Sequence, residues 1–589
     1  MSRFAFMFRF NGALALFPIL LAAAGTARSQ PIEPPGRIAQ LAYIENAVAF
    51  QPAGFTEQVP AELNRPVTTA DHLWTEPGAR AELQTNNAEF RLGGQTSFTF
   101  LNLADDVTQV QMTTGVLNLR LHSLAPGEAF EVDTPQLSVA LQAGDYRIHV
   151  NEQGDATTLT VRWGAAQIVY GTKTMLVPGG AQVRVTGVYN PTFMERVGEF
   201  TAWTVALILG GDPNLEQQAV RPPDRFDDWC AARDARLDNA ASAQFVSRDI
   251  PGYADLDGQG DWTFVDAYGW VWFPTNQGQW APYRFGHWAW IAPWGWTWID
   301  AAVWGFAPSH YGNWVFVNDT WGWAPGQILA RPRYSPAVVA FASFEAGVVV
   351  GSEPVVAWFP LSFGELVGVG VDYVLSRIGI TAMVQSAFAD GLASGRDSID
   401  IPQRDLSAAQ VGKSPGVAPN RKASLGARGT VHSTEPQKVA DRGVRSQKQP
   451  PARPKPFEQQ RSEAQHAAQA QRSEPQRAAQ PGQRSEPQRT AQPGQRSEPQ
   501  RAVQPGQRSG QQRAAQPGQR SEPQRAAERK TGSVPKAEGN PAPEKRGGFH
   551  MPSRTDIKNL GKPGAQTGVK PGAKPSPSSG ITQPKKPKK

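Results

Sequence analysis

A tryptophan-rich stretch that recurs every 26 residues limits the folds open to this chain more than any other feature. It begins "GDWTFVDAYGWVWFP", Gly260 to Pro274, and thirteen of the eighteen tryptophans lie between Trp262 and Trp323. The positions in register are Gly260, Gly286 and Gly312; Trp262, Trp288 and Trp314; Phe264, Trp290 and Phe316; and Val265, Ile291 and Val317. A fixed period that matches at so many positions predicts a threefold supersecondary unit.

Each copy has the pattern of a β-hairpin. An alternating arm that contains Trp262 precedes a turn such as "DAYG", and a second alternating arm that contains Trp270 follows the turn. The third copy slips by one residue, because Gly269 and Gly295 correspond to Gly322. A single hairpin is marginal in water, so we expect the three units to share one aromatic layer.

Two interpretations of these aromatic residues stay open. Indoles bring a large apolar area, so they can form the core of a small β unit that has little Leu or Ile. An aromatic row interleaved with Asp, Asn and Gly can instead leave rings exposed to stack on sugar rings or other flat apolar faces. The candidate ligand-binding residues are Trp262, Trp270, Trp272, Trp288, Trp290, Trp296, Trp298, Trp314 and Trp323.

The polar residues of the repeat carry no recognisable catalytic or metal-binding pattern. His287, His310, Asp266, Asp300 and Asp319 could in principle join a metal or acid/base site, but their spacing fits no ligand signature. The chain also has no nucleophile elbow, zinc-protease motif, phosphate loop or dinucleotide glycine motif. We therefore expect no catalytic residue, no metal and no cofactor.

Two acidic pairs elsewhere in the chain could suggest acid/base chemistry. Asp227 with Asp228, and Asp255 with Asp257, are more typical of helix starts and turns. The sequence thus predicts a protein that is not an enzyme. A glycan-cleaving carboxylate pair assembled from distant strands is the alternative, since such a pair leaves no local motif.

Residues 36–187 consist of short alternating runs separated by Gly, Pro, Asn and Asp. In "GVLNLRLHSL", Leu117, Leu119 and Leu121 fall on one side while Arg120 and His122 fall on the other, which predicts a half-buried strand. Many such runs at spacings of eight to twelve residues predict a β-sandwich or a short β-solenoid.

The runs "LWTEPGARAEL", "FRLG", "FEVDTP", "LQAGDYRIHV" and "VRWGAAQIV" resemble the FecR-type domain of bacterial envelope proteins. The resemblance covers residues 36–187 and implies a β domain outside the cytoplasm. That family includes the periplasmic part of iron-transport regulators, which receive a signal from an outer-membrane receptor. This chain lacks the regulators' cytoplasmic anti-sigma segment and their preceding membrane helix, so we do not expect transmembrane signalling.

Residues 190–250 are expected to form a partly helical connector. In "PPDRFDDWCAARDARLDNAAS" the prolines suit a helix start, and Phe226, Trp229, Cys230 and Leu237 recur at helical spacing. Cys230 is the single cysteine, so the chain can form no internal disulfide. We expect its thiol to be a small side chain on the apolar face of this helix.

The Trp-rich segment is similar to the Trp-rich domain of unknown function found beside FecR-like domains in secreted proteins of Gram-negative bacteria. The similarity is carried by the repeat in residues 251–330 and continues through "SPAVVAF" and "VAWFPL" in a C-terminal extension, 331–402. The resemblance implies architecture and compartment, since that family has no established activity.

The N-terminus has the layout of a secretory signal peptide at residues 1–29. Arg3 and Arg9 precede an apolar run from Gly12 to Ala24, and small residues follow. The run has about thirteen residues, short of the roughly 20 needed to cross a bilayer, and no later run is long enough. We expect a periplasmic or secreted protein of the Gram-negative envelope without a transmembrane helix after cleavage.

Residues 403–589 are expected to be a disordered basic tail rich in Pro, Gln and Arg. From residue 401 onward there are 36 Lys and Arg against 13 Asp and Glu, whereas the preceding part is acidic. A 12-residue repeat, "QRSEPQRAAQPG", begins at Gln471 and predicts extended or polyproline-like coil. The tail could bind anionic surfaces or act as a spacer, and its lack of stacking aromatics argues against nucleic acid.

The sequence therefore predicts a mainly β, exported, non-enzymatic interaction or scaffold protein of the cell envelope. In this hypothesis the Trp-rich module binds envelope polysaccharide, peptidoglycan or lipopolysaccharide, or self-associates, and the tail tethers the protein to anionic surfaces. The alternative is an accessory sensor whose FecR-like domain receives an envelope partner protein.

Overall fold

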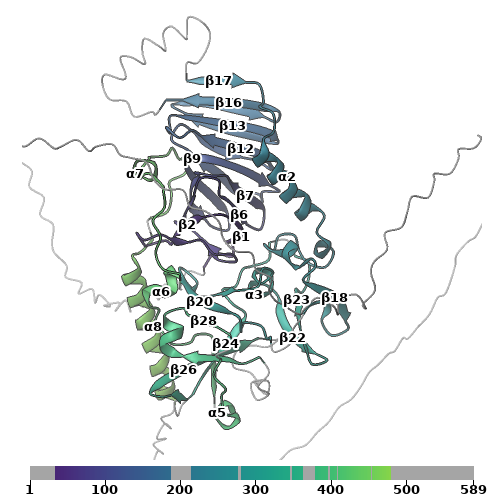
Figure 1. Ribbon diagram of the computed structural model, residues 1–589, viewed down its shortest axis with the longest axis vertical. Coiled ribbons are helices and arrows are strands. Elements are labelled where there is room, and N and C mark those ends of the chain that lie inside the picture. The colour runs from purple at the N-terminus through teal and green to yellow at the C-terminus, as the bar shows by residue number, and fades with distance from the viewer. Residues whose placement is uncertain are drawn as a thin grey trace, which may run out of the picture. The chain divides into compact units, whose positions relative to one another are not determined.

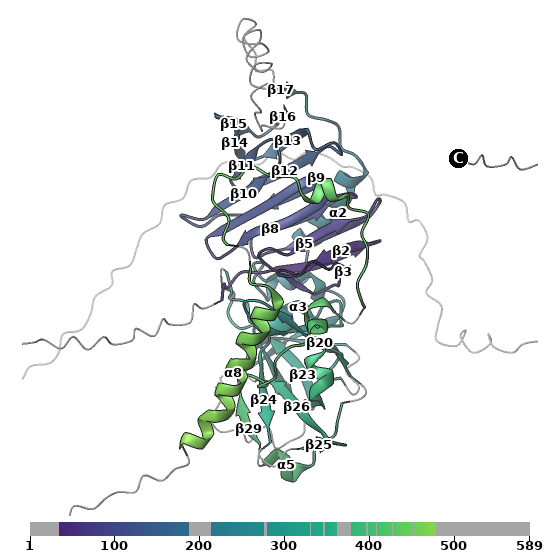
Figure 2. The same ribbon diagram turned by 90° about the vertical axis from the view of Figure 1, so that its left-hand side faces the viewer.

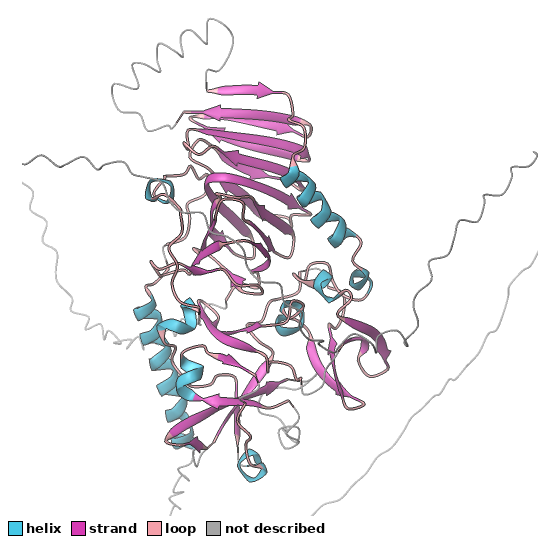
Figure 3. Ribbon diagram, viewed as in Figure 1, coloured by secondary structure: helices cyan, strands magenta, loops and turns pink. Residues whose placement is uncertain are grey.

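The computed structural model is mainly β, as the alternating patterns predict (Figures 1 and 3). It describes residues 34–187, 214–275, 280–329, 331–344, 348–361, 379–395, 398–407, 409–426, 428–452 and 454–478. The expected signal peptide and the tail beyond residue 478 lie outside these residues. None of the helices in the described ranges is long and apolar enough to span a membrane.

The FecR-like region contains two sheets, named sheet A and sheet B. Sheet A has the order β4-β1-β6-β7-β9-β12-β13-β16-β17, and sheet B has β3-β2-β5-β8-β9-β10-β11-β14-β15. The strands of sheet A are β1 (Ala39–Glu45), β4 (Pro66–Val67), β6 (Arg80–Gln84), β7 (Ala88–Leu92), β9 (Val107–Leu121), β12 (Gly144–Val150), β13 (Ala156–Trp163), β16 (Ala181–Thr186) and β17 (Leu215–Gln218). The other strands of sheet B are β2 (Val48–Gln51), β3 (Val59–Pro60), β5 (His72–Thr75), β8 (Ser97–Leu103), β10 (Ala129–Asp133), β11 (Ser138–Leu141), β14 (Ala165–Tyr170) and β15 (Lys173–Pro178).

Strand β9 belongs to both sheets. Its first part pairs with β8 and β10, and its last part, from Gly115, pairs with β7 and β12. Gly115 has a φ of +93°, and a Cβ there would lie 2.4 Å from the Cα of Thr96, so glycine is required where the strand changes sheets. The aliphatic core lies between the two layers, which matches a sandwich more closely than a solenoid.

Helix α2 (Arg225–Asp238) covers the outer face of sheet A. The alternation predicts that the polar side of β9 faces solvent, but α2 lies against it. Arginines of the sheet meet acids of the helix: Arg120 lies 3.1 Å from Asp234 and 2.9 Å from Asp238. The helix begins one residue after Asp224, whose side chain completes a capping box with Asp227. Ion pairs therefore attach the predicted connector helix to sheet A.

Cys230 lies on the sheet side of α2, as its helical spacing predicts, and is 2% exposed. Burial raises the pKa of its thiol to about 12. The thiol is therefore protonated at neutral pH and acts as a packed apolar side chain.

The three Trp-rich copies are three hairpins, as the 26-residue period predicts. They are β18 (Gly260–Val265) with β19 (Gly269–Pro274), β20 (Gly286–Ile291) with β21 (Gly295–Asp300), and β22 (Asn313–Val317) with β23 (Thr320–Ala324). In each hairpin the two equivalent tryptophans face one another: Trp262 opposite Trp272, Trp288 opposite Trp298, and Trp314 opposite Trp323.

The third copy is shifted by one residue in its second arm, but in the direction opposite to the one that Gly322 predicts. Trp323 is equivalent to Trp272 and Trp298 and comes one residue earlier than the period gives, and Gly322 occupies the position of Val271 and Thr297, so its predicted correspondence with Gly269 and Gly295 is wrong. The shift comes from the turn. In the first two hairpins three residues separate the paired ends, and Gly269 and Gly295 follow with φ of +77° and +83°. In the third, only Asn318 and Asp319 separate the ends, and both have positive φ. This is the pattern of a two-residue hairpin turn in which both central residues are left-handed.

The hairpins do not form one sheet. The first and third join through β19 and β23, whereas the second pairs with the short strand β28 (Ala393–Ser394) of the extension. The extension adds strands of a further sheet and a short helix: β24 (Val339–Ser343), β25 (Val349–Val350), β26 (Glu353–Pro360), β27 (Thr381–Val384) and α4 (Gln385–Ala389). Strand β29 (Gln410–Gly412), which pairs with β24, comes from the segment after residue 402 that was expected to be disordered. One aromatic core joins all three hairpins with Trp358 of β26. The shared aromatic layer is therefore present.

The expectation of disorder from residue 403 is wrong for the first part of the tail. The described residues there include α5 (Gln403–Ser407), α6 (Arg421–Leu425), α7 (Gln437–Ala440) and α8 (Phe457–Ala478). Isolated apolar residues insert into the body: Ala423, Val439 and Phe457 are 1–3% exposed. Amino-acid composition predicts whether a segment can form a hydrophobic core of its own. It does not predict that single apolar residues of the segment will pack against the cores of the preceding β domains. Helix α8 also includes the start of the repeat at Gln471, where coil is expected.

Candidate functional site

The structure buries six of the nine candidate ligand-binding tryptophans. Trp272, Trp288, Trp296, Trp298, Trp314 and Trp323 have exposed fractions between 0 and 8%. These six rings have no face free for a ligand, so the interpretation of the aromatics as core is correct for them. Trp262 and Trp290 are half-buried, and Trp270 is 43% exposed.

Many of the buried indoles also bind distant backbone through their N–H groups. Trp296 donates to the carbonyl of Val417 at 2.8 Å, and Trp358 donates to that of Tyr283 at 2.8 Å. Trp298 donates to the Asp300 carboxylate at 3.0 Å. The aromatic side chains therefore fill the core and hold irregular segments against it.

The exposed aromatic surface gathers at the first hairpin, where β18 is an edge strand (Figure 1). We name the group formed by Phe245, Trp262, Phe264 and Trp270 the aromatic platform. Phe245 lies between two indoles, with ring centroids 4.9 Å from Trp262 and 4.6 Å from Trp270. Phe264, 58% exposed, contacts Trp270 edge to face at 5.7 Å. Opposite positions on paired strands place these two rings on one face.

The platform is fixed from below by polar contacts. The indole N–H of Trp262 donates to the Ser242 hydroxyl at 3.2 Å. Asp257 accepts hydrogen bonds from the backbone N–H groups of Ala241 and Ser242 at 2.7 and 2.9 Å, at the start of the 3₁₀ turn η1 (Ala241–Gln244). Asp257 is thus a turn acid, as predicted. The platform combines rigid support with exposed ring faces.

The remaining acids and histidines do not converge on a chemical site. In the described part of the chain, no group of three or more His, Cys, Asp or Glu could hold a metal. Burial raises the pKa of Asp300 to about 6 and lowers that of His310 to about 4. Each has a structural partner, since Asp300 accepts from Trp298 and His310 Nδ1 lies 2.9 Å from the Ser335 carbonyl.

The two acidic pairs singled out in the sequence are also structural. Asp227 belongs to the α2 capping box, and Arg147 donates to it at 2.6 Å. Asp255 pairs with Arg236 of α2 at 2.7 Å. Asp227 therefore makes the helix-start contact that its position predicts, and Asp255 binds a helix residue 19 positions away in the sequence.

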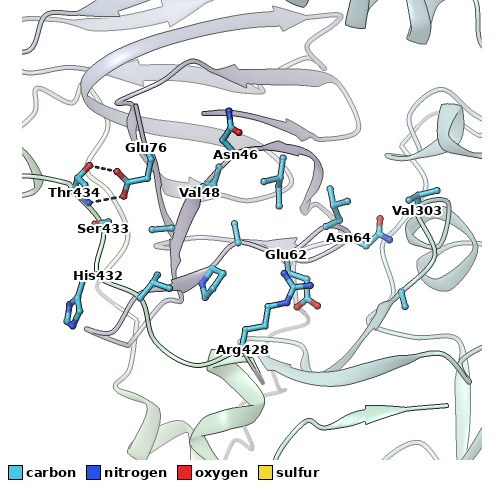
Figure 4. A pocket seen from close by; sticks show the side chains of 18 of the residues that line it. Asn46, Val48, Glu62, Asn64, Glu76, Val303, Arg428, His432, Ser433 and Thr434 are labelled. Atoms are coloured by element: carbon cyan, nitrogen blue, oxygen red, sulfur yellow. Dashed lines mark hydrogen bonds between the residues drawn. The ribbon is translucent and has the colours of Figure 1, made fainter. Parts of the chain in front are cut away.

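A hollow of about 860 Å³ that the sequence does not predict is lined by Asn46, Val48, Glu62, Asn64, Glu76, Asp300, Val303, Arg428, His432, Ser433 and Thr434, among others (Figure 4). Thr434 closes one side, where its N–H donates to Glu76 at 2.8 Å. Its lining mixes apolar and charged groups from segments far apart in sequence, so no local motif could reveal it. Glu62, Arg428 and His432 contribute polar groups to its wall.

Two families match separate parts of the chain. Residues 71–167 match the FecR protein family, and residues 253–365 match a family of unknown function (DUF6600). A comparison with curated proteins gives no match.

Two crystal structures, each described as a candidate anti-sigma factor from Parabacteroides distasonis ATCC 8503, show partial similarity. One is 17% identical and covers 20% of this chain and 56% of its own, with a TM-score of 0.19. The other is 13% identical and covers 28% of this chain and 91% of its own, also with a TM-score of 0.19. No functional conclusion follows from similarity at this level.

The residues matched are those of the two-sheet region and of the three hairpins with the beginning of their extension. This protein therefore carries a FecR-like β domain and, after it, the Trp-rich domain of a family whose function is unknown.

Proposed function

We propose that this protein is an exported, non-enzymatic interaction protein of the cell envelope, and that the aromatic platform is the part of the Trp-rich domain that binds an envelope glycan. The observation that carries the proposal is the exposure of Trp270 and Phe264, 43% and 58%, beside Trp262 and Phe245. The apolar faces of sugar rings stack on such surfaces, because both partners are flat and lose contact with water.

The proposal narrows the candidate binding residues from nine tryptophans to the exposed ones. Trp270 and Trp262 form the centre of the platform, and Phe264 extends it. Trp290 is half-buried beside Trp296, 5.7 Å between ring centroids, and belongs to the second hairpin rather than to the platform.

The test uses the full chain and two matched substitutions of exposed tryptophans. Trp270→Ala removes the centre of the platform, whereas Trp163→Ala removes an indole of similar exposure, 50%, from the FecR-like domain. Binding is measured by co-sedimentation with peptidoglycan and by calorimetric titration with lipopolysaccharide and neutral polysaccharides. We expect Trp270→Ala to weaken binding to one of these polymers by at least about tenfold, or roughly 1.4 kcal/mol.

Trp163→Ala should bind like the unmodified protein. The proposal fails if no polymer of the panel binds, or if Trp270→Ala binds as tightly as Trp163→Ala. Loss of binding in both variants would point to a general apolar effect and would also count against the platform.

The FecR family match favours a second function, an accessory sensor whose FecR-like domain receives an envelope partner protein. The end of the domain away from β3 and β4 offers an apolar surface for such a partner, with Leu176 of the edge strand β15 62% exposed and Trp163 50% exposed. Photo-cross-linking from position 176 in the full chain, within whole envelopes, should then capture one defined protein. A ladder of many weak products would contradict the sensor.

A further inference from the structure

Two buried carboxylates and a buried amide lie together on the outer face of sheet B, apart from the aromatic platform and from the hollow. Parallel pairing of β9 with β10 places Gln109 beside Glu131, and Asp133 follows two residues later on the same face. Their exposed fractions are 0, 3 and 0%. Buried carboxylates need hydrogen-bond donors. We name these three residues the carboxylate site.

Within sheet B, Ser138 donates to Glu131 at 2.9 Å and Gln109 donates to Asp133 at 3.1 Å. An extended segment of the same chain supplies further donors, and Figure 2 shows it in green across sheet B. The Ser446 hydroxyl donates to Asp133 at 2.7 Å, and the Gln447 N–H donates to Glu131 at 2.6 Å. The Gln109 amide in turn donates to the carbonyl oxygen of the next residue, 448, at 2.8 Å. Two of the three contacts thus use backbone groups of the segment, in the manner of peptide recognition.

Arg445 fixes the direction of the segment. Its N–H donates to the Thr134 carbonyl at 3.1 Å, and its guanidinium Nη1 donates to the Gly171 carbonyl at 3.1 Å. The site is not saturated, since Asp133 Oδ1 and Gln109 Oε1 are buried without a hydrogen-bond partner. Burial and the neighbouring Glu131 also raise the pKa of Asp133.

The residues that the site contacts recur in the repeats of the tail. The order Gly-x-Arg-Ser occurs at 443–446 and again at 482–485, 494–497, 506–509 and 518–521. The two following positions are Glu-Pro in most repeats and Gly-Gln in one. At these two positions the site contacts the backbone N–H of Gln447 and the carbonyl oxygen of Lys448. The residues that replace Gln447 and Lys448 in the repeats keep these two backbone groups. Proline is tolerated in place of Lys448, because it lacks the N–H but keeps the carbonyl oxygen.

We propose that the carboxylate site is a recognition site for extended Arg-Ser segments, and that a second copy of this chain supplies such a segment in competition with residues 445–448. The tethered segment has the advantage of proximity at low protein concentration. A second chain offers several equivalent segments, and this multivalency favours binding between chains. Because binding between chains also depends on how often they meet, self-association rises with protein concentration.

The test measures self-association of the full chain by sedimentation velocity over a range of concentrations. Arg445→Ala with Ser446→Ala frees the site, and we expect this variant to associate at a concentration at least about tenfold lower than the unmodified chain. A general attraction between basic tail and acidic body predicts the opposite sign, because the variant has lost a positive charge. Adding Glu131→Ala and Asp133→Ala to the freed variant should return it to the monomer.

A charge-preserving control separates recognition from nonspecific aggregation. In the freed variant, the order of Arg and Ser is exchanged in each repeat, which keeps the net charge. The changes are Arg484→Ser with Ser485→Arg, and the same exchange at 496/497, 508/509 and 520/521. We call this protein the inverted chain. We expect the inverted chain to be monomeric. The proposal is overturned if the inverted chain associates as well as its parent, or if freeing the site leaves association unchanged.

Discussion

The FecR-like domain and the Trp-rich domain are both built from antiparallel strands, but they are held together in different ways. The main core cluster of the FecR-like domain consists of aliphatic residues, Phe, Tyr and one Met, and the buried Trp74 of β5 packs in a separate small cluster with Ala49 and Val439. The core of the Trp-rich domain includes eight buried tryptophans, and six further indoles or aromatic rings pack against it. Polar contacts also differ, since arginine–carboxylate pairs dominate the first and indole N–H bonds the second.

The difference follows from how the strands pair rather than from their length. In the FecR-like domain, strands of 2 to 15 residues form two large sheets whose regular inner faces meet, so aliphatic side chains with some Phe and Tyr fill the space. The hairpins have arms of five or six residues and are divided between two small sheets. Large rings fill the irregular gaps between them, and the N–H groups of Trp296, Trp323 and Trp358 bind backbone carbonyls.

The largest expected loss of folding stability comes from the removal of a fully buried indole. Trp298→Ala should destabilise the Trp-rich domain by about 3–5 kcal/mol, because it leaves a cavity and takes away the hydrogen bond to Asp300. Leu119→Ala in the FecR-like domain, also fully buried, should cost about 2–5 kcal/mol and leave the hairpins protected. Urea unfolding with hydrogen exchange locates each loss. A smaller effect for Trp298→Ala than for Leu119→Ala would contradict the comparison.

Low pH should weaken the ion pairs of the FecR-like domain and so lower its folding stability. Burial raises the pKa of Glu82, but Arg233 and Arg91 outweigh burial and lower it to about 2. Because the folded pKa is below the unfolded one, the stability is present above about pH 4.5 and is lost as the pH falls toward 2. We expect a loss of roughly 3 kcal/mol from this group.

The measurement compares the urea unfolding free energy at pH 5 and pH 2.5 for the unmodified chain and for Glu82→Gln. The substitution removes the titration of Glu82, so the difference between the two pH dependences isolates it. Equal pH dependence in both proteins would show that Glu82 does not contribute to the attachment of α2.

The role of the indole N–H can be separated from that of ring size. Trp298→Phe leaves Asp300 Oδ2 without its donor, although Oδ1 still accepts from the Ala302 N–H. The N–H of Trp272, equally buried, has no hydrogen-bond partner. Trp298→Phe should therefore cost about 1–3 kcal/mol more than Trp272→Phe. Thermal unfolding of the two variants gives the answer, and equal losses would mean that these rings act through packing alone.

The smallest expected effect on stability is at the aromatic platform. Trp270→Ala should change the free energy of unfolding by less than about 1 kcal/mol, because the ring is only partly buried. A loss as large as that of Trp298→Ala would place Trp270 in the structural core and remove the reason to assign it a ligand.

Local features of the fold could be predicted where the signal is carried by neighbouring residues. The 26-residue period predicted the three hairpins, but the predicted correspondence of Gly322 with Gly269 and Gly295 is wrong, because the shorter turn at Asn318 and Asp319 moves the second arm one residue earlier. The spacing of Phe226, Cys230 and Leu237 predicted the buried face of α2. Asp227 was predicted as a helix-start acid, because the contacts of a capping box lie within one helical turn. Asp257 was predicted as a turn acid, but the turn that it binds lies 15 residues away in the sequence.

Burial of individual rings could not be predicted in the same way. Both arms of every hairpin carry indoles, so alternation alone does not show which face a distant segment covers. Trp296 is buried because Val417 and Phe388 lie against it. Within the described residues, the rings that contact Trp270 are Phe245 and Phe264, and the indole stays 43% exposed. The first part of the tail was mispredicted for the same reason, since its buried residues depend on a surface formed elsewhere.

The sequence by itself determined the strand content, the hairpin repeat, its turns and the helix cap, because backbone hydrogen bonding and side-chain periodicity act over a few residues. Only the tertiary structure decided which tryptophans are core, that α2 covers sheet A, and that residues 445–448 fill the carboxylate site. The physical reason is that burial, ion pairing and desolvation depend on which segments meet, and the segments that meet here lie up to hundreds of residues apart in the chain.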